Sequence, residues 1–186
     1  MKKIVLTFLL SCAVLLISGC VTSQTYYQPS SRVGKVYKSL CHGTMGFPDG
    51  LIFSQGKNHV WIRTYRKIEN PEVLVLQLRL EAFEKKRIEF NSSRIEIVTS
   101  GKTENHKFKS IRPFNFKPPY SDITIPFQQI ITETSYECYL FIAELPVVAD
   151  QFTVRLPGLR IDDIVFDFGQ IDFIKVSGWV FMPLNC

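Results

Sequence analysis

Histidine is scarce in this chain, and the motifs that usually mark a catalytic or metal-binding protein are missing. The three histidines, His42, His59 and His106, stand at unrelated spacings, so neither a His-x-x-x-His nor a Cys-x-x-Cys ligand pattern forms. The chain also lacks a Gly-x-Ser-x-Gly nucleophile motif and a glycine-rich phosphate-binding loop. We therefore expect neither a metal nor another cofactor.

A strong excess of either charge is missing as well. The formal net charge is +5 over 186 residues, and two of the lysines, Lys2 and Lys3, belong to the extreme N-terminus. Without residues 1–19 the chain has 20 basic and 17 acidic residues, a net charge of +3. Proteins that bind nucleic acids usually carry a far more basic surface. We expect no nucleic-acid partner.

Long apolar runs are absent except for one at the start of the chain. Residues 4–17 are uncharged and mostly apolar, and they follow two lysines. The run is shorter than the roughly 20 apolar residues that a bilayer-spanning helix needs, and it fits the apolar region of a secretory signal peptide. It ends on Ile17, Ser18 and Gly19, directly before Cys20. An uncleaved N-terminal anchor helix is the alternative.

The order of an apolar residue, two small residues and a cysteine resembles the lipobox of bacterial lipoproteins. The resemblance implies that residues 1–19 are a signal peptide cut off before Cys20. It also implies that Cys20 receives a thioether-linked diacylglycerol and an amide-linked acyl chain such as palmitate. Val21 stands where an aspartate usually signals retention in the inner membrane, which favours the outer membrane; the periplasmic face of the inner membrane is the alternative. The membrane, reached through the lipid anchor, is then one partner.

This interpretation accounts for two of the five cysteines in the chain. Cys12 leaves with the signal peptide and Cys20 is lipidated, so Cys41, Cys138 and Cys186 remain in an oxidising compartment. We expect a disulfide between Cys41 and Cys186, because they lie near the two ends of the domain and domain termini are often close in space. A Cys41–Cys138 bond is the main rival. In the favoured pairing Cys138 is a buried free thiol.

The remainder divides into a tether and one domain. Residues 20–34 are polar, contain a proline and have almost no aliphatic side chains, which predicts the lipidated cysteine followed by a flexible tether. Residues 35–186 are long enough for a single domain with a core of its own.

Within this domain the apolar pattern predicts eight to ten short strands and no strong amphipathic helix. Residues 72–83 are the hardest segment, because a proline-containing helix start competes with strict alternation from Leu74 to Leu80, and the alternation favours a strand. At residues 91–93 the apolar phase changes, which predicts a turn, a bulge or a crossing between sheets. The fold class is all-β: an antiparallel β-sandwich, with an immunoglobulin-like arrangement as the first choice and a barrel as the alternative.

Residues 102–120 mix basic and aromatic side chains, and we take this segment as a possible contact surface. This mixture suits an anionic surface or an acidic partner. An ordinary loop whose aromatic rings dock on the domain is the alternative. The residues proposed to make contact are Lys107, Lys109, Phe114, Phe116 and Lys117.

Together these patterns predict a non-catalytic lipoprotein of the bacterial envelope, facing the periplasm or the cell surface. It would bind or scaffold another envelope protein. The alternative is an envelope hydrolase or thiol enzyme whose residues converge only in the fold, for instance around His59 or His106.

Overall fold

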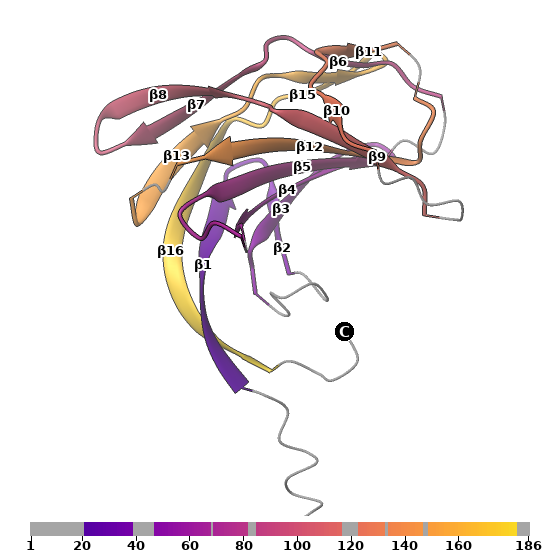
Figure 1. Cartoon of the computed structure of the whole chain (residues 1–186). Coiled ribbons are helices and arrows are strands. Elements are labelled where there is room, and N and C mark those ends of the chain that lie inside the picture. Colours follow the sequence, from indigo (N-terminus) through magenta and orange to yellow (C-terminus); the bar gives the residue numbers. More distant parts are fainter. Residues whose placement is uncertain are drawn as a thin grey trace, which may run out of the picture.

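The computed structural model describes residues 21–38, 47–67, 69–81, 85–116, 123–132, 134–146 and 149–181. In these ranges the chain is all-β, with sixteen strands in three antiparallel sheets (Figure 1). No helix among the described residues has the length and hydropathy that crossing a membrane requires. The predicted all-β, antiparallel class is confirmed, and the sheets pack as a sandwich.

The largest sheet has seven strands and is organised around its two central members. These are β5 (Leu74–Glu81) and β12 (Cys138–Leu145), which pair along eight residues. The order across the sheet is β10-β9-β12-β5-β4-β3-β2, and the other strands are β10 (Ile125–Pro126), β9 (Ser110–Phe114), β4 (Asn58–Arg66), β3 (Gly50–Gln55) and β2 (Lys35–Tyr37).

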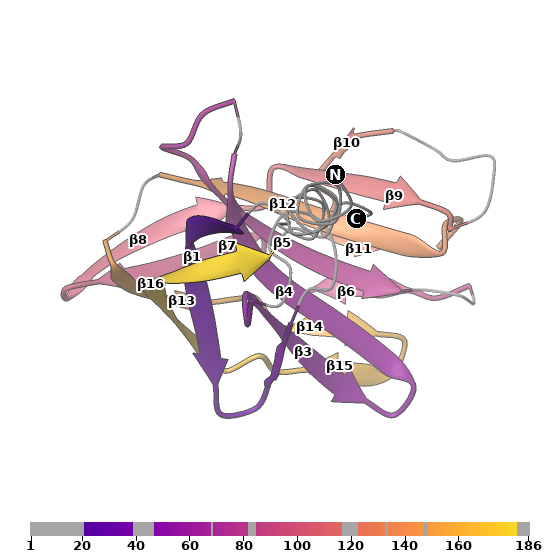
Figure 2. The ribbon, with the colours of Figure 1, turned by 90° about the horizontal axis from the view of Figure 1, so that it is seen from below.

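The second sheet has five strands and joins the two ends of the described chain. Its longest strands, β1 (Val21–Ser31) and β16 (Gln170–Phe181), pair over eleven positions, from Val21 opposite Phe181 to Ser31 opposite Ile171. Their order is β1-β16-β13-β7-β8, which adds β13 (Gln151–Arg155), β7 (Arg94–Thr99) and β8 (Lys102–Lys107). The β1–β16 ribbon curves away from the body of the molecule (Figure 1). In the view from below, this ribbon and the strands β3 and β4 are nearest to the viewer (Figure 2).

A small four-stranded sheet closes one end of the sandwich. Its order is β11-β6-β14-β15, with β11 (Ile130–Ile131), β6 (Ile88–Phe90), β14 (Leu159–Ile161) and β15 (Ile164–Phe166). The chain leaves β6 for β7 of the five-stranded sheet at residues 91–93. The predicted change of phase is therefore a crossing between sheets.

Aromatic rings fill the space between the sheets. The Phe90 ring of β6 lies 4.9 Å from that of Phe141 in β12, and Phe53 of β3 lies 5.1 Å from Phe168. These contacts are edge-on, which is the favoured geometry for aromatic pairs in a core. All four side chains are buried. Phenylalanine side chains therefore make up much of the interior between the sheets.

The flexible tether predicted for residues 20–34 is wrong for its greater part, because residues 21–31 form β1. The segment has few apolar side chains to bury, and its backbone is ordered instead by hydrogen bonds to β16. Tyr27 anchors this strand: it is 3% exposed, and its ring lies 5.1 Å from that of Phe152. The ordered domain therefore includes Val21, well before the predicted boundary at residue 35.

The segment that was hardest to predict, residues 72–83, contains β5 from Leu74 to Glu81, so the strand prediction holds there. The predicted number of strands is too low. Six of the sixteen strands have three residues or fewer, which is too short to create a visible alternation. The immunoglobulin-like arrangement stays a prediction.

Candidate functional site

The outer face of the seven-stranded sheet carries a row of aromatic and basic side chains. In β4 every second residue from Asn58 to Thr64 is buried, so His59, Trp61, Arg63 and Tyr65 stand on the opposite face. Strand register sets Trp61 of β4 opposite Arg79 of β5, and Arg79 opposite Leu140 of β12. We call this surface the outer face.

Arg79 is the centre of a cation–π stack at one end of the outer face. Its guanidinium carbon lies 5.1 Å from the centroid of the Trp61 ring and 5.5 Å from that of Phe116. One guanidinium nitrogen lies 2.5 Å from Oε1 of Glu81, and the Phe116 ring lies edge-on 5.4 Å from Phe114. The stack holds a flat cation between two rings, a geometry that lysine does not provide.

A shallow pocket of about 360 Å³ lies at the other end of the outer face. Lys67 and Lys109 flank Glu144, with nitrogen–oxygen distances of 3.1 and 2.7 Å to its two carboxylate oxygens. Tyr65, Val75 and Ile142 complete the apolar part of the wall. The pocket thus combines two cations, one carboxylate and an apolar floor.

The two lysines control the charge at this pocket. Hydrogen bonds from Lys109 and then Lys67 hold the pKa of Glu144 below its ordinary value. The bond to Glu144 raises the pKa of Lys67. Both shifts favour the charged forms of Glu144 and Lys67. With two lysines and one carboxylate, the cluster has a formal excess of one positive charge. An anionic group of a partner would find that charge beside apolar side chains.

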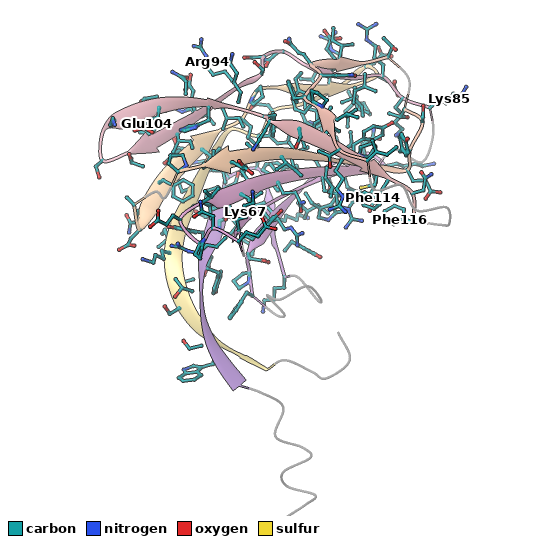
Figure 3. All side chains as sticks on the ribbon, viewed as in Figure 1. Lys67, Lys85, Arg94, Glu104, Phe114 and Phe116 are labelled. Carbon is teal, nitrogen blue, oxygen red and sulfur yellow. The ribbon has the colours of Figure 1, made fainter. Side chains whose placement is uncertain are left out.

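The predicted contact residues divide between two sheets. Lys107 ends β8 in the five-stranded sheet, and the chain crosses at residues 108–109 into β9 of the seven-stranded sheet. Lys109, Phe114 and Phe116 share the outer face with Lys67. Figure 3 shows Phe114, Phe116 and Lys67 below the sheet, and Glu104 of β8 in the upper layer. The structure therefore brings together three of the five predicted contact residues and sets Lys107 apart. Lys117, like Cys20, Cys41 and Cys186, lies outside the described residues.

The sequence did not single out Trp61, Arg79 or Glu144. Each stands at an outward position of an alternating strand, where polar and aromatic residues are ordinary. Their proximity depends on the register between segments far apart in the chain, so no local spacing could reveal it. The one available signal was the alternation itself, which identified the outward face without showing what gathers on it.

The two described histidines were the candidate centres of a catalytic site. His59 Nδ1 lies 2.9 Å from Ser54 Oγ beside the turn between β3 and β4, and His106 Nε2 lies 3.6 Å from Glu104. Among the contacts of the described residues, neither histidine joins a nucleophile to a carboxylate. Neither lines the pocket on the outer face. No group of three or more potential metal ligands gathers within the described ranges.

Cys138 is a free thiol and is completely buried. Burial raises the pKa of Cys138 to about 12, although the Arg79 guanidinium beside it acts in the opposite direction. A thiol of this kind is protonated and unreactive at neutral pH. The favoured disulfide leaves Cys138 unpaired in this way; the Cys41–Cys186 bond itself stays a prediction.

Known proteins give no further guide. The chain matches no family model, no curated protein and no solved structure. The functional interpretation therefore depends on the residues themselves.

Proposed function

We propose that the protein is a lipid-anchored, non-catalytic binding module of the bacterial envelope. The anchor is Cys20, at the end of the Ile17-Ser18-Gly19-Cys20 pattern, and its acyl chains hold the domain at the outer membrane. Each buried methylene contributes about 0.8 kcal/mol, and several chains together give a stable attachment. The partner is another envelope protein, bound on the outer face of the seven-stranded sheet.

The observation that carries the binding role is the composition of the outer face. The Arg79 stack and the Lys67–Glu144–Lys109 pocket place cations beside aromatic rings and the apolar lining of the pocket on one continuous sheet surface. Binding sites on proteins are enriched in aromatic residues and arginine, and charge complementarity selects the partner. These features favour a protein segment that carries carboxylates beside apolar side chains.

The proposal can be tested by site-specific photocrosslinking in intact cells. A photoreactive phenylalanine analogue replaces Tyr65, which lines the pocket and is 36% exposed. The control position is Arg94, which is exposed on the five-stranded sheet (Figure 3). We expect one discrete crosslinked protein from position 65 and none from position 94.

A matched pair of charge variants then tests whether the crosslink depends on a lysine of the outer face or on the positive charge of the protein in general. Lys109→Gln should weaken the crosslink from position 65, because it removes a cation of the pocket. Lys107→Gln removes the same charge two residues away on the other sheet and should leave the crosslink unchanged. Equal loss in both variants, or no crosslink at position 65, would contradict the binding site. Intact mass of the wild type and of Cys20→Ala reports the lipid, and membrane fractionation distinguishes the outer from the inner membrane.

A further inference from the structure

Trp179 is the most exposed large hydrophobic side chain among the described residues. It belongs to β16 and is 75% exposed. Tryptophan is rarely left so open on a protein surface without a contact, because its indole ring is large and apolar apart from one N–H group.

The position of Trp179 is fixed by the pairing of β1 with β16. Trp179 stands opposite Ser23, three residues after Cys20. The neighbouring pair on the same side of the ribbon is Thr25 and Ser177, whose hydroxyl oxygens lie 3.3 Å apart. Trp179 is therefore a single indole on a surface of small hydroxyl groups, near the end of the ribbon where the lipobox cysteine stands.

Chain geometry limits the distance between the anchor and the level of the indole. Three residues of chain span at most about 10 Å, so Cys20 lies no farther than that from Ser23, the partner of Trp179. The headgroup layer of a bilayer is about 5–8 Å thick on each side of the hydrocarbon core, so the ribbon must lie tilted for the indole to reach it. Tryptophan concentrates in this layer because its ring is apolar and its N–H is polar.

We propose that Trp179 inserts its indole into the headgroup layer of the membrane that holds Cys20. The end of the β1–β16 ribbon is then the membrane-contacting part of the protein, attached at two points, the acyl chains and the indole. This inference rests on the lipid anchor proposed above. Two points of attachment restrict the tilt of the domain, which a single acylated residue would leave free.

Tyr26 and Tyr27 also belong to the ribbon, and both make contacts within the protein. Tyr27 is buried, and the Tyr26 ring stacks on Phe47 at 4.2 Å. Gly178 adds to this packing, because a Cβ atom at this position would lie 2.6 Å from the Phe47 ring. Tyr26 and Gly178 thus pack with Phe47 on one side of the ribbon. Trp179 stands on the other side, which it shares with Tyr27 farther along the ribbon.

The test uses fluorescence of the full-length lipidated protein in vesicles of phosphatidylethanolamine and phosphatidylglycerol. The chain has two tryptophans, so Trp61→Phe leaves Trp179 as the only indole and keeps a ring beside Arg79. We expect the emission of Trp179 to shift to shorter wavelength and to lose intensity when lipids brominated near the headgroup are included. In the matched variant, Trp179→Phe, the remaining Trp61 should show no bromine-dependent loss.

The mass of Cys20 separates the two ways in which this test can fail. If Cys20 carries lipid and Trp179 still emits like an indole in water without quenching, the inference is overturned and the anchor stands. If Cys20 carries no lipid, the anchor and the inference fall together. Quenching of both tryptophans alike would also contradict the inference, because it would show non-specific adsorption of the domain.

Discussion

Cys138 shows how one residue can be correctly predicted and still acquire a meaning that only the structure provides. Its position in an apolar strand predicted a buried, hydrophobic cysteine, and the thiol is buried in β12. Its neighbour Arg79 comes from β5, through a register that the sequence does not display. The thiol is therefore part of the structure beneath the proposed binding surface.

We expect the Cys138 thiol to resist alkylation in the folded protein at pH 8 and to react fully in urea. Peptide-level mass spectrometry after native and denatured labelling measures this. Burial also predicts a pH effect on the free energy of unfolding. The unfolded thiol ionises near its ordinary pKa of 9.0 and the folded thiol near 12, so the unfolded state binds fewer protons in between.

The contribution of Cys138 to stability should therefore fall as the pH rises from about 9 to about 12. Cys138→Ala lacks the thiol and should show a shallower decline over the same range. Rapid labelling of Cys138 in the native protein would contradict both the burial and the pKa.

At the scale of the element, β1 is where prediction from the sequence failed. Its residues are polar and include Pro29, which together predicted disorder. The strand forms because β16 pairs with it over eleven positions, and its few core contacts, above all Tyr27, are too sparse to read as a pattern. A strand that is ordered mainly by its neighbour leaves little trace in its own composition.

Tyr27→Ala distinguishes a strand from a tether. We expect it to lower the free energy of unfolding by about 3 kcal/mol, the cost of removing a buried aromatic ring. Gln28→Ala, at the adjacent exposed position, should change it by less than about 0.5 kcal/mol. Urea denaturation followed by circular dichroism measures both. If both substitutions changed the free energy of unfolding by the same small amount, the segment would be a flexible tether and not a strand.

Other elements were predictable for physical reasons. The strand β5 alternates strictly because Leu74, Leu76, Leu78 and Leu80 all face the core. The crossing from β6 to β7 was visible because a change of sheet reverses which residues face inward. The two- and three-residue strands were not predictable, since they add only one or two inward positions each.

At the scale of the whole molecule, the sequence anticipated the class of fold but not the assembly of the candidate site. Residues 102–120 were treated as one surface because they are contiguous. The chain passes between two sheets there, so Lys107 and Lys109 diverge although they are two residues apart. Trp61, Arg79 and Phe116 meet although they are distant in the chain. Three-dimensional register decides both outcomes.

The sheet order also predicts how protection from hydrogen exchange is distributed. Amides of β12 should exchange slowest, because this strand pairs on both sides, with β5 and β9, and its core residues are buried. Amides in β8, which pairs with β7 at the margin of its sheet, should exchange much faster. Hydrogen–deuterium exchange with peptide-level mass spectrometry tests this order. Slower exchange in β8 than in β12 would contradict the described topology.

Under the proposed anchoring at Cys20, the β1–β16 ribbon also sets the distance between the bilayer and the body of the domain. Among the described side chains of this strand, Tyr27 is the first that is buried. It lies four residues after Ser23, the partner of Trp179, which is a rise of about 13 Å at about 3.3 Å per residue. The ribbon leaves the body on the side that carries Lys67 and Phe116 (Figures 1 and 3). The outer face would then be turned toward the bilayer, and a partner would have to approach it along the membrane surface.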